Sequence, residues 1–340
     1  MMKKLLPIVA NSTAFDKFVA LLEHSGGERA NLLRVLTYHR VDEPDAHPWL
    51  DPGLISASPQ AFEMQMKYLA ARYQPISASD VLQAFEGQYA LPPRAVLVTF
   101  DDAYSDFEKH AWSILKQYQI PAILFVPTAF PDHPQRTFWW DRLFNAIHTT
   151  VVDELNTSTG RLPIATALQR NQAYKSIKNY LKTLPHDKAM ADVDRICSEL
   201  GVPTHDNSVL GWDSLRRLVG NGLTLGAHTR NHPIMNCITP DELQKEVSDS
   251  LHDLRREIGL VPQTFAYPSG IHNKEAVKTV ERAGFKLAFT TERGINEVGH
   301  ADRLRLQRIN VSPRTTLPVL RAQLLSWSAP LHSLGNKLFS

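Results

Sequence analysis

Residues 95–102 read Ala-Val-Leu-Val-Thr-Phe-Asp-Asp, an apolar run that ends in two adjacent carboxylates. A short run rich in β-branched and aromatic residues predicts a buried strand. Similar runs lie at Ala122–Val126, Leu223–Ala227, Thr264–Tyr267 and Leu287–Thr290. Helical patterns separate these runs, and such an alternation of strands with helices predicts a parallel sheet covered by helices.

The helices between the strands carry start and stop signals. Thr239-Pro240-Asp241-Glu242 combines an N-cap, a proline in the first turn and the glutamate of a capping box. The apolar residues behind it keep helical spacing as far as Ile258. A second helix is predicted from Lys274 to Ala283, before Gly284, and a third begins at Ser58-Pro59.

Residues 138–210 break this alternation, because the segment is rich in helical patterns and has no convincing strand. Tyr174–Leu184 and Lys188–Leu200 are the helices expected there. We interpret the segment as a helical insertion between two strands of a domain that spans residues 31–325. A helical extension over residues 1–30 precedes this domain, and a tail over residues 326–340 follows it.

The composition is that of an ordinary globular enzyme. The chain has 340 residues, an apolar fraction of 43%, a charged fraction of 21% and a net charge of +2. Because it lacks a dense Lys/Arg cluster, we do not expect it to bind nucleic acid. Cys197 and Cys237 are far apart and in no metal-type spacing, so two unpaired buried thiols are favoured over one disulfide.

The N-terminus carries no convincing cleaved signal peptide. The apolar stretch within Met1–Ala10 is short, and no run in the chain approaches the roughly 18 residues of a membrane span. We therefore expect the protein to be cytoplasmic or peripheral to the membrane. Phe15, Phe18, Val19 and Leu22 have helical spacing. Their apolar face is expected to pack on the protein's own domain, with contact to a membrane surface as the alternative.

The carboxylates of Asp101 and Asp102 stand at the C-terminal end of a strand, where the active sites of parallel α/β barrels are built. Successive side chains of an extended segment point in different directions. One carboxylate can therefore bind a metal ion while its neighbour reaches an attacking water. The alternative is a strand that simply ends in polar loop residues.

His228 and His232 follow the predicted strand Leu223–Ala227 and are four residues apart, so they can converge on one ion. Two exposed loop histidines are the alternative interpretation. With one aspartate from another strand end they supply three protein ligands and leave coordination positions open, which is typical of a catalytic metal. Zn²⁺ is the ion expected for such a site, and Co²⁺ or Ni²⁺ suits the same ligands.

Three segments resemble the motifs of a known family. They are Thr99-Phe100-Asp101-Asp102, His228-Thr229-Arg230-Asn231-His232-Pro233 and Phe265-Ala266-Tyr267-Pro268-Ser269-Gly270. In this order they are similar to the first three motifs of the polysaccharide deacetylases, the NodB-homology domains of carbohydrate esterase family 4. The resemblance extends from about Val35 to Leu325, without the insertion. It implies a distorted (β/α) barrel and a metal-dependent hydrolase that removes acetyl groups, most often N-acetyl groups, from a carbohydrate or a glycan precursor.

Position by position, the resemblance implies that Asp101 is the general base. The metal ligands it implies are Asp102, His228 and His232. A carboxylate that does not bind the metal can take the proton of the attacking water. The third motif, Tyr267-Pro268-Ser269, is expected at the substrate, with the N–H of Ser269 stabilising the oxyanion.

Three departures from the family pattern are visible. Ala103 replaces the glycine after the two aspartates, and Ala266 replaces the arginine that orients the base. The C-terminal strand around residues 306–311 lacks the family's Leu-x-His, which carries the general acid. Arg308 on that strand is a candidate for the orienting arginine, and a structural ion pair is its alternative role.

His39 is the candidate for the missing acid. It lies in Leu36-Thr37-Tyr38-His39-Arg40-Val41, at the end of the first apolar run of the domain. This segment is similar to the Tyr-His element of the branch that includes the poly-N-acetylglucosamine deacetylases of biofilms, where the histidine serves as the acid. A purely structural histidine is the alternative. Trp139 and Trp140, at the start of the insertion, are expected either to stack on a sugar as a wall of the substrate site or to be buried.

The sequence leaves two other classes of function open. The departures at Ala266 and in the C-terminal strand fit a non-catalytic glycan-binding protein on the same fold. A hydrolase of small non-sugar amides is the third interpretation. Acetate release from an acetylated oligosaccharide distinguishes the first two interpretations, and a substrate survey separates the third. The sugar, its linkage, the choice between N- and O-acetyl groups and the oligomeric state have no signature in the sequence.

Overall fold

The structure, a computed structural model, describes residues 13–25, 29–43, 45–134, 136–203, 209–259 and 261–326. The predictions on Met1–Ala10 and on all but the first residue of the tail lie outside these ranges. The helices are α2 (Thr13–Ser25), α3 (Pro59–Arg72), α4 (Ala78–Phe85), α5 (Trp112–Gln117), α6 (Trp139–Thr149), α7 (Ala167–Leu181), α8 (His186–Leu200), α9 (Trp212–Gly220), α10 (Pro240–Ile258), α11 (Lys274–Arg282) and α12 (Leu317–Leu324).

The strands are β1 (Leu32–Tyr38), β2 (Arg40–Val41), β3 (Ile55–Ala57), β4 (Gln74–Pro75), β5 (Ala95–Phe100), β6 (Ala122–Val126), β7 (Glu154–Thr157), β8 (Gly160–Pro163), β9 (Thr224–Ala227), β10 (Thr264–Ala266), β11 (Leu287–Arg293), β12 (Asn296–Glu297) and β13 (Leu306–Asn310). Three short turns of helix complete the list: η1 (Pro52–Leu54), η2 (Phe107–Ala111) and η3 (Pro268–Gly270).

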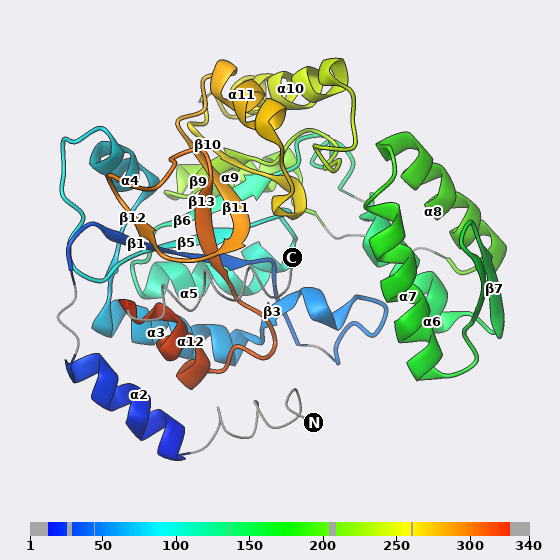
Figure 1. Cartoon of the computed structure of the whole chain (residues 1–340), viewed down its shortest axis with the longest axis horizontal. Helices are drawn as coiled ribbons and strands as arrows, with labels where there is room; N and C mark the ends of the chain where they lie inside the picture. The colour runs from blue at the N-terminus through cyan, green and yellow to red at the C-terminus, as the bar shows by residue number, and fades with distance from the viewer. Residues whose placement is uncertain are drawn as a thin grey trace.

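The strands close into a barrel. They follow one another in the order β1-β13-β11-β10-β9-β6-β5, and β5 pairs again with β1, so that 7 parallel strands form a ring. Helices cover the outside of this ring, and α6, α7 and α8 stand together to one side of it (Figure 1). The predicted (β/α) barrel is therefore confirmed.

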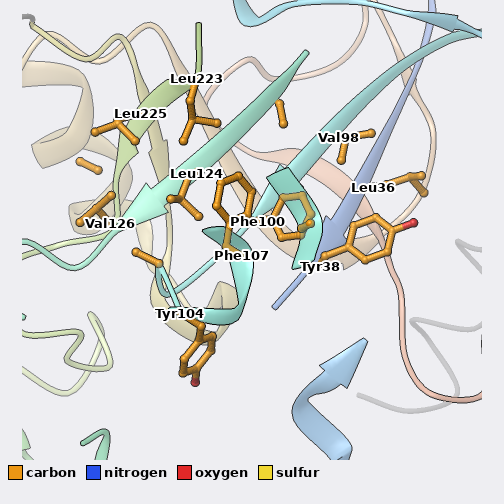
Figure 2. Close-up of a cluster of buried hydrophobic side chains, with 14 of the residues drawn as sticks. Leu36, Tyr38, Val98, Phe100, Tyr104, Phe107, Leu124, Val126, Leu223 and Leu225 are labelled. Atoms are coloured by element: carbon orange, nitrogen blue, oxygen red, sulfur yellow. The ribbon is translucent and has the colours of Figure 1, made fainter. Parts of the chain in front are cut away.

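Side chains alternate between the two faces of each strand. One buried cluster joins Val35 of β1, Leu97 of β5, Phe125 of β6 and Phe289 of β11, and strands on different sides of the ring can share a cluster only in its interior. The intervening residues pack outward against the helices. Figure 2 shows part of this outer layer, with Tyr38, Phe100 and Leu124 among the labelled side chains. Position along a strand thus decides which residues face the inside of the barrel at its C-terminal mouth.

The local signals located the regular elements well. Strands β5 and β6 have the predicted bounds. Helix α10 begins behind the Thr239 capping box and ends at Gly259, whose φ of 75° places it in the left-handed region. These boundaries depend on neighbouring residues alone, which is why the sequence predicts them.

The expectation of no strand within residues 138–210 is wrong. The segment that connects β6 to β9 contains an antiparallel hairpin of β7 and β8. Most of the residues in these strands are exposed, so they lack the apolar alternation that predicts a strand. Helix α7 also begins earlier than predicted, because Thr166 and Gln169 form a capping box in front of it.

The N-terminal helix α2 packs against α12, as expected of an amphipathic helix on its own domain. Val19 is buried, whereas Phe18 and Leu21 are 54% and 65% exposed. Among the described helices, none is long and apolar enough to cross a membrane. Cys197 and Cys237 are free, as predicted, but partly exposed and not buried.

Candidate metal centre and active site

His39 and Asp101 leave neighbouring strands at the mouth of the barrel. Tyr38 of β1 and Phe100 of β5 are partners in register, and the backbone N–H of Asp101 donates to the carbonyl of Tyr38 at 3.0 Å. His39 continues the inner face of β1, and Asp101 continues the inner face of β5. The two side chains therefore stand next to each other and line one cavity.

Asp102 leaves the strand through an unusual backbone turn. It has a φ of 73° and Ala103 has a φ of 52°, a region that costs an L-residue roughly 1–2 kcal/mol. This conformation explains why glycine suits the position of Ala103 in the family pattern. Tyr104, just beyond the turn, acts to lower the pKa of Asp102, and its hydroxyl accepts from Trp140 Nε1 at 2.9 Å.

Helix α10 fixes the loop that carries the two histidines. Thr229 and His232 have φ values of 60° and 58°. The carboxylate of Glu246 accepts the backbone N–H groups of Arg230 and Asn231, both at 2.8 Å. The N–H of His232 donates to the hydroxyl of Thr229 at 3.0 Å. A left-handed residue persists when its surroundings determine it, and these bonds provide that constraint.

The ligand atoms of Asp102, His228 and His232 all lie within 4.8 Å of one another. Nε2 of His228 and Nε2 of His232 are 3.6 Å and 3.4 Å from Oδ1 of Asp102. Nδ1 of His228 lies 2.7 Å from the carbonyl of Ala266, and donation to that carbonyl leaves Nε2 as the lone-pair atom. Oδ1 of Asp102 is buried and has no hydrogen-bond partner in the described part of the chain. Lone pairs that face one another without a proton between them fit a divalent cation.

The electrostatics of these ligands agree with a cation site. Burial raises the pKa of Asp102 well above its ordinary value, and the charge of Asp101 acts in the same direction. Burial also lowers the pKa of His232 well below its ordinary value. The protein alone thus disfavours a charge on either group, and a bound cation would favour the ionised aspartate and the neutral histidine.

Asp101 forms a two-point ion pair with Arg308. The guanidinium of Arg308 donates to both carboxylate oxygens, at 2.8 Å and 2.7 Å, and to the carbonyl of Thr290 at 2.6 Å. Burial acts to raise the pKa of Asp101, but the charge of Arg308 and its hydrogen bonds outweigh this effect and hold the pKa well below its ordinary value. Asp101 is therefore ionised near neutral pH. Arg308 makes the contact expected of an orienting arginine, and Ala266 instead orients His228 through its carbonyl.

The candidate residues line one cavity of about 180 Å³. Its wall contains the predicted residues His39, Asp101, Asp102, Trp140, His228, His232 and Ser269. It also contains Trp139, the predicted partner of Trp140, and residues that sequence reasoning missed, namely Leu54, Tyr174, Lys178, Lys182 and Thr291. Helices α6 and α7 of the insertion contribute the tryptophans, the tyrosine and both lysines, so the insertion forms one side of the site.

In the third motif, Ser269 alone reaches the cavity. It has a φ of 54°, and the hydrogen bonds that close its turn come from the N–H groups of Gly270 and Ile271. A Cβ on Gly270 would lie 2.0 Å from Oγ1 of Thr291, so only glycine fits beside Ser269.

The expectation that Tyr267 and Pro268 contact the substrate is not met by their side chains. Tyr267 continues the outer face of β10, where its hydroxyl donates to the carbonyl of Leu304 at 2.9 Å. Pro268 is buried and does not line the cavity. Strand alternation explains this result, because Ala266 occupies the inner face and Tyr267 the outer one.

His39 and Trp140 line the cavity but do not belong to the candidate metal cluster. The described hydrogen bond of His39 runs from its backbone N–H to Oγ of Ser56, at 2.9 Å. Burial lowers the pKa of His39 to about 4, with the charge of Asp101 acting against this effect, so the ring is neutral near pH 7.

Trp140 stacks on Phe138 with 4.4 Å between ring centroids and is only 7% exposed. Trp140 is thus mainly a buried support of the site.

Helix α10 carries two supporting carboxylates that sequence reasoning missed. Glu246 holds the histidine loop, and Asp253 accepts from Oγ1 of Thr128 at 2.9 Å and from Nε of Arg230 at 3.1 Å. Both lie next to apolar positions of the helix, and Asp253 is 2% exposed. A carboxylate beside the buried face of an amphipathic helix was the available signal.

Comparison with known proteins identifies the family. A family model described as polysaccharide deacetylase matches residues 88–288, more than half of the chain. The chain therefore belongs to the polysaccharide deacetylase family. The poly-β-1,6-N-acetyl-D-glucosamine N-deacetylase of Escherichia coli K12 is 21% identical over 295 residues, which cover 86% of this chain and 38% of that relative. The chain thus spans well under half the length of this relative.

Two solved structures share the fold. The deacetylase PplD of Streptococcus pyogenes, in complex with acetate, aligns with a TM-score of 0.59 and 21% identity over 87% of this chain and 99% of its own. IcaB of Ammonifex degensii aligns with a TM-score of 0.59 and 20% identity over 87% of this chain and 98% of its own. At this level of identity the likeness shows a common barrel and no more.

Proposed function

We propose that the chain is a metal-dependent hydrolase that removes acetyl groups, N-acetyl groups in the first place, from a carbohydrate or a glycan precursor. One observation carries the proposal. The Asp102-His228-His232 cluster lies beside an ionised Asp101 in one cavity, within a chain of the polysaccharide deacetylase family. A metal site and an adjacent free carboxylate are the two groups that hydrolysis of an acetyl amide requires.

The residues divide the chemistry among them. A divalent ion held by the three ligands, Zn²⁺ by preference, supplies Lewis acidity towards the acetyl carbonyl and towards water. Asp101, kept ionised and oriented by Arg308, accepts the proton of the attacking water. The N–H of Ser269 donates to the carbonyl oxygen as negative charge develops there.

Arg308 also bears on the non-catalytic alternative. That alternative was motivated in part by Ala266, which stands in place of the family's orienting arginine. The two-point ion pair of Arg308 with Asp101 gives the base an orienting partner from another strand. The geometry therefore favours a hydrolase over a barrel that only binds glycans.

Metal analysis combined with acetate release tests the proposed function. We expect one equivalent of metal per chain and acetate release from N-acetylglucosamine oligomers, abolished by a chelator and restored by Zn²⁺, Co²⁺ or Ni²⁺. Full metal occupancy with no release from N- or O-acetylated glycans would support the non-catalytic alternative. Release from small non-sugar amides alone would make the protein an amidohydrolase of another class.

Replacing His39 with alanine should leave the fold and the metal intact and lower turnover of N-acetyl substrates about 10²-fold or more. The amine leaves poorly unless it gains a proton, and His39 lines the cavity beside Asp101 without belonging to the metal cluster. Because the resting ring is neutral near pH 7, it must take up a proton during the reaction before it can deliver one. O-acetyl esters need less help and should lose less activity.

The measurement is acetate release from N-acetyl and O-acetyl substrates at saturating metal. The exposed His300, remote from the cavity, is the matched control, and His300→Ala should behave as the wild type. Unchanged amide turnover in His39→Ala would remove His39 from the mechanism.

A further inference from the structure

Helix α7 presents two lysines to the cavity, Lys178 and, one turn further, Lys182 at the helix end. The charge of Lys178 is already balanced. Its ammonium lies 3.1 Å from Oδ2 of Asp51, which also accepts from the hydroxyl of Tyr174 at 2.9 Å. The ammonium of Lys178 further lies 4.6 Å from the centroid of the Tyr174 ring. Lys178 therefore has a structural role in holding the insertion to the η1 turn.

Lys182 differs from Lys178 in having no such partner. Among the described residues, no side chain or carbonyl forms an ion pair or hydrogen bond with its ammonium. Its side chain nevertheless lines the same cavity as Asp102, His228 and His232, and its charge acts to lower the pKa values of both His39 and His232. Burial lowers the pKa of Lys182, and the charge of Lys178 adds to this effect while Asp102 opposes it. A half-buried cation without a counter-ion is unfavourable unless a ligand supplies one.

The other charges of the cavity leave Lys182 unbalanced. Asp101 is neutralised by Arg308, and Lys178 by Asp51. Among the described residues of the wall, Asp102 is the other carboxylate. A divalent ion bound in the cluster would carry more positive charge than the single negative charge of Asp102 balances. Lys182 adds a further positive charge on the same wall. A loaded site of this kind is complementary to an anion and not to a neutral sugar.

We propose that Lys182 binds an anionic group carried by the acetylated substrate, either a carboxylate or a phosphate. The inference rests on the proposed function and specifies its substrate class as an acidic acetylated glycan or a phosphorylated precursor. An ammonium forms its strongest hydrogen bonds with such oxyanions. At about 180 Å³ the cavity is smaller than the usual pocket for a drug-sized ligand, so the anion belongs to the reacting sugar or to its immediate neighbour.

A comparison of three acetylated substrates tests the proposal. They are a neutral N-acetylglucosamine oligomer, a disaccharide of N-acetylglucosamine with glucuronic acid, and N-acetylglucosamine 1-phosphate. The wild type should have a higher kcat/KM for an acidic substrate than for the neutral one. A higher kcat/KM for the acidic disaccharide would identify a uronate as the anion, and a higher kcat/KM for N-acetylglucosamine 1-phosphate would identify a phosphate.

In Lys182→Met the ratio of acidic to neutral kcat/KM should fall about 10- to 100-fold, the range expected for one hydrogen bond to a charged group. Lys182→Arg keeps the charge and should retain most of the preference. Lys175, exposed on the same helix, provides the matched control, and Lys175→Met should keep the full preference.

A binding measurement separates this proposal from the proposed function. The protein at saturating Zn²⁺ is mixed rapidly with N-acetylglucosamine 1-phosphate and with the acidic disaccharide, and binding before turnover is followed by the fluorescence of Trp139 and Trp140 in the cavity wall. The Kd of the favoured ligand should rise about tenfold or more in Lys182→Met and stay unchanged in Lys175→Met. This result is obtained even if no acetate is released from any substrate. A wild type that prefers the neutral oligomer, or equal Kd values in Lys182→Met and the wild type, would overturn the proposal.

Discussion

Asp101→Asn should lower acetate release by about 10²- to 10⁴-fold, the usual contribution of a general base, while the protein keeps its metal. Asparagine preserves the shape of the side chain but cannot accept the proton of the attacking water. The proposed metal ligands do not include Asp101, so metal content should stay close to one equivalent. Both quantities are measured on the same purified protein.

The same substitution should also destabilise the fold. Arg308 is fully buried and would lose its counter-charge, which costs on the order of 3–5 kcal/mol for a buried pair. Asp106 offers a control, because it is buried, lies 3.3 Å from the buried Arg40 and does not line the cavity. Arg40 would keep Asp141 at 2.8 Å, so the loss of stability should be smaller than for Arg308. Asp106→Asn should lose stability and keep turnover per folded molecule. If Asp101→Asn loses its metal as fully as Asp102→Ala, the roles of the two carboxylates are reversed.

Asp102→Ala should abolish metal binding and, with it, acetate release from every substrate. The variant retains two histidines that share no carboxylate, and the charge that balances the cation is gone. A metal at a thousand times its Kd stabilises a protein by about 4 kcal/mol. The wild type should therefore unfold at a clearly higher temperature with Zn²⁺ than with a chelator, and Asp102→Ala should show no such shift.

This readout is independent of turnover, so it tests the site even if the substrate is wrong. Asp106→Asn, which leaves the ligands intact, should keep the shift in unfolding temperature. Retention of one equivalent of metal by Asp102→Ala would mean that other residues hold it.

The sequence by itself determined the elements and the motif residues. The runs at β5 and β6 and the capping box of α10 depend on neighbours within a few residues, so they can be read without the fold. The Asp-His-His cluster could be proposed as a metal site because two strand ends carry unusual pairs of residues. Strand alternation also predicts that the Tyr267 side chain faces outward, because Ala266 and Tyr267 are adjacent and cannot share a face of the strand.

Other features depended on how distant segments meet. Arg308 reaches Asp101 across 207 positions of sequence, and only closure of the barrel makes β13 and β5 the two parallel neighbours of β1. Glu246 supports the histidine loop because α10 folds back over it. Lys182 lines the cavity because the insertion lies beside the barrel mouth, where both contribute to its wall. Periodicity and capping are short-range effects, whereas a site built from several strand ends and an insertion is decided by tertiary packing.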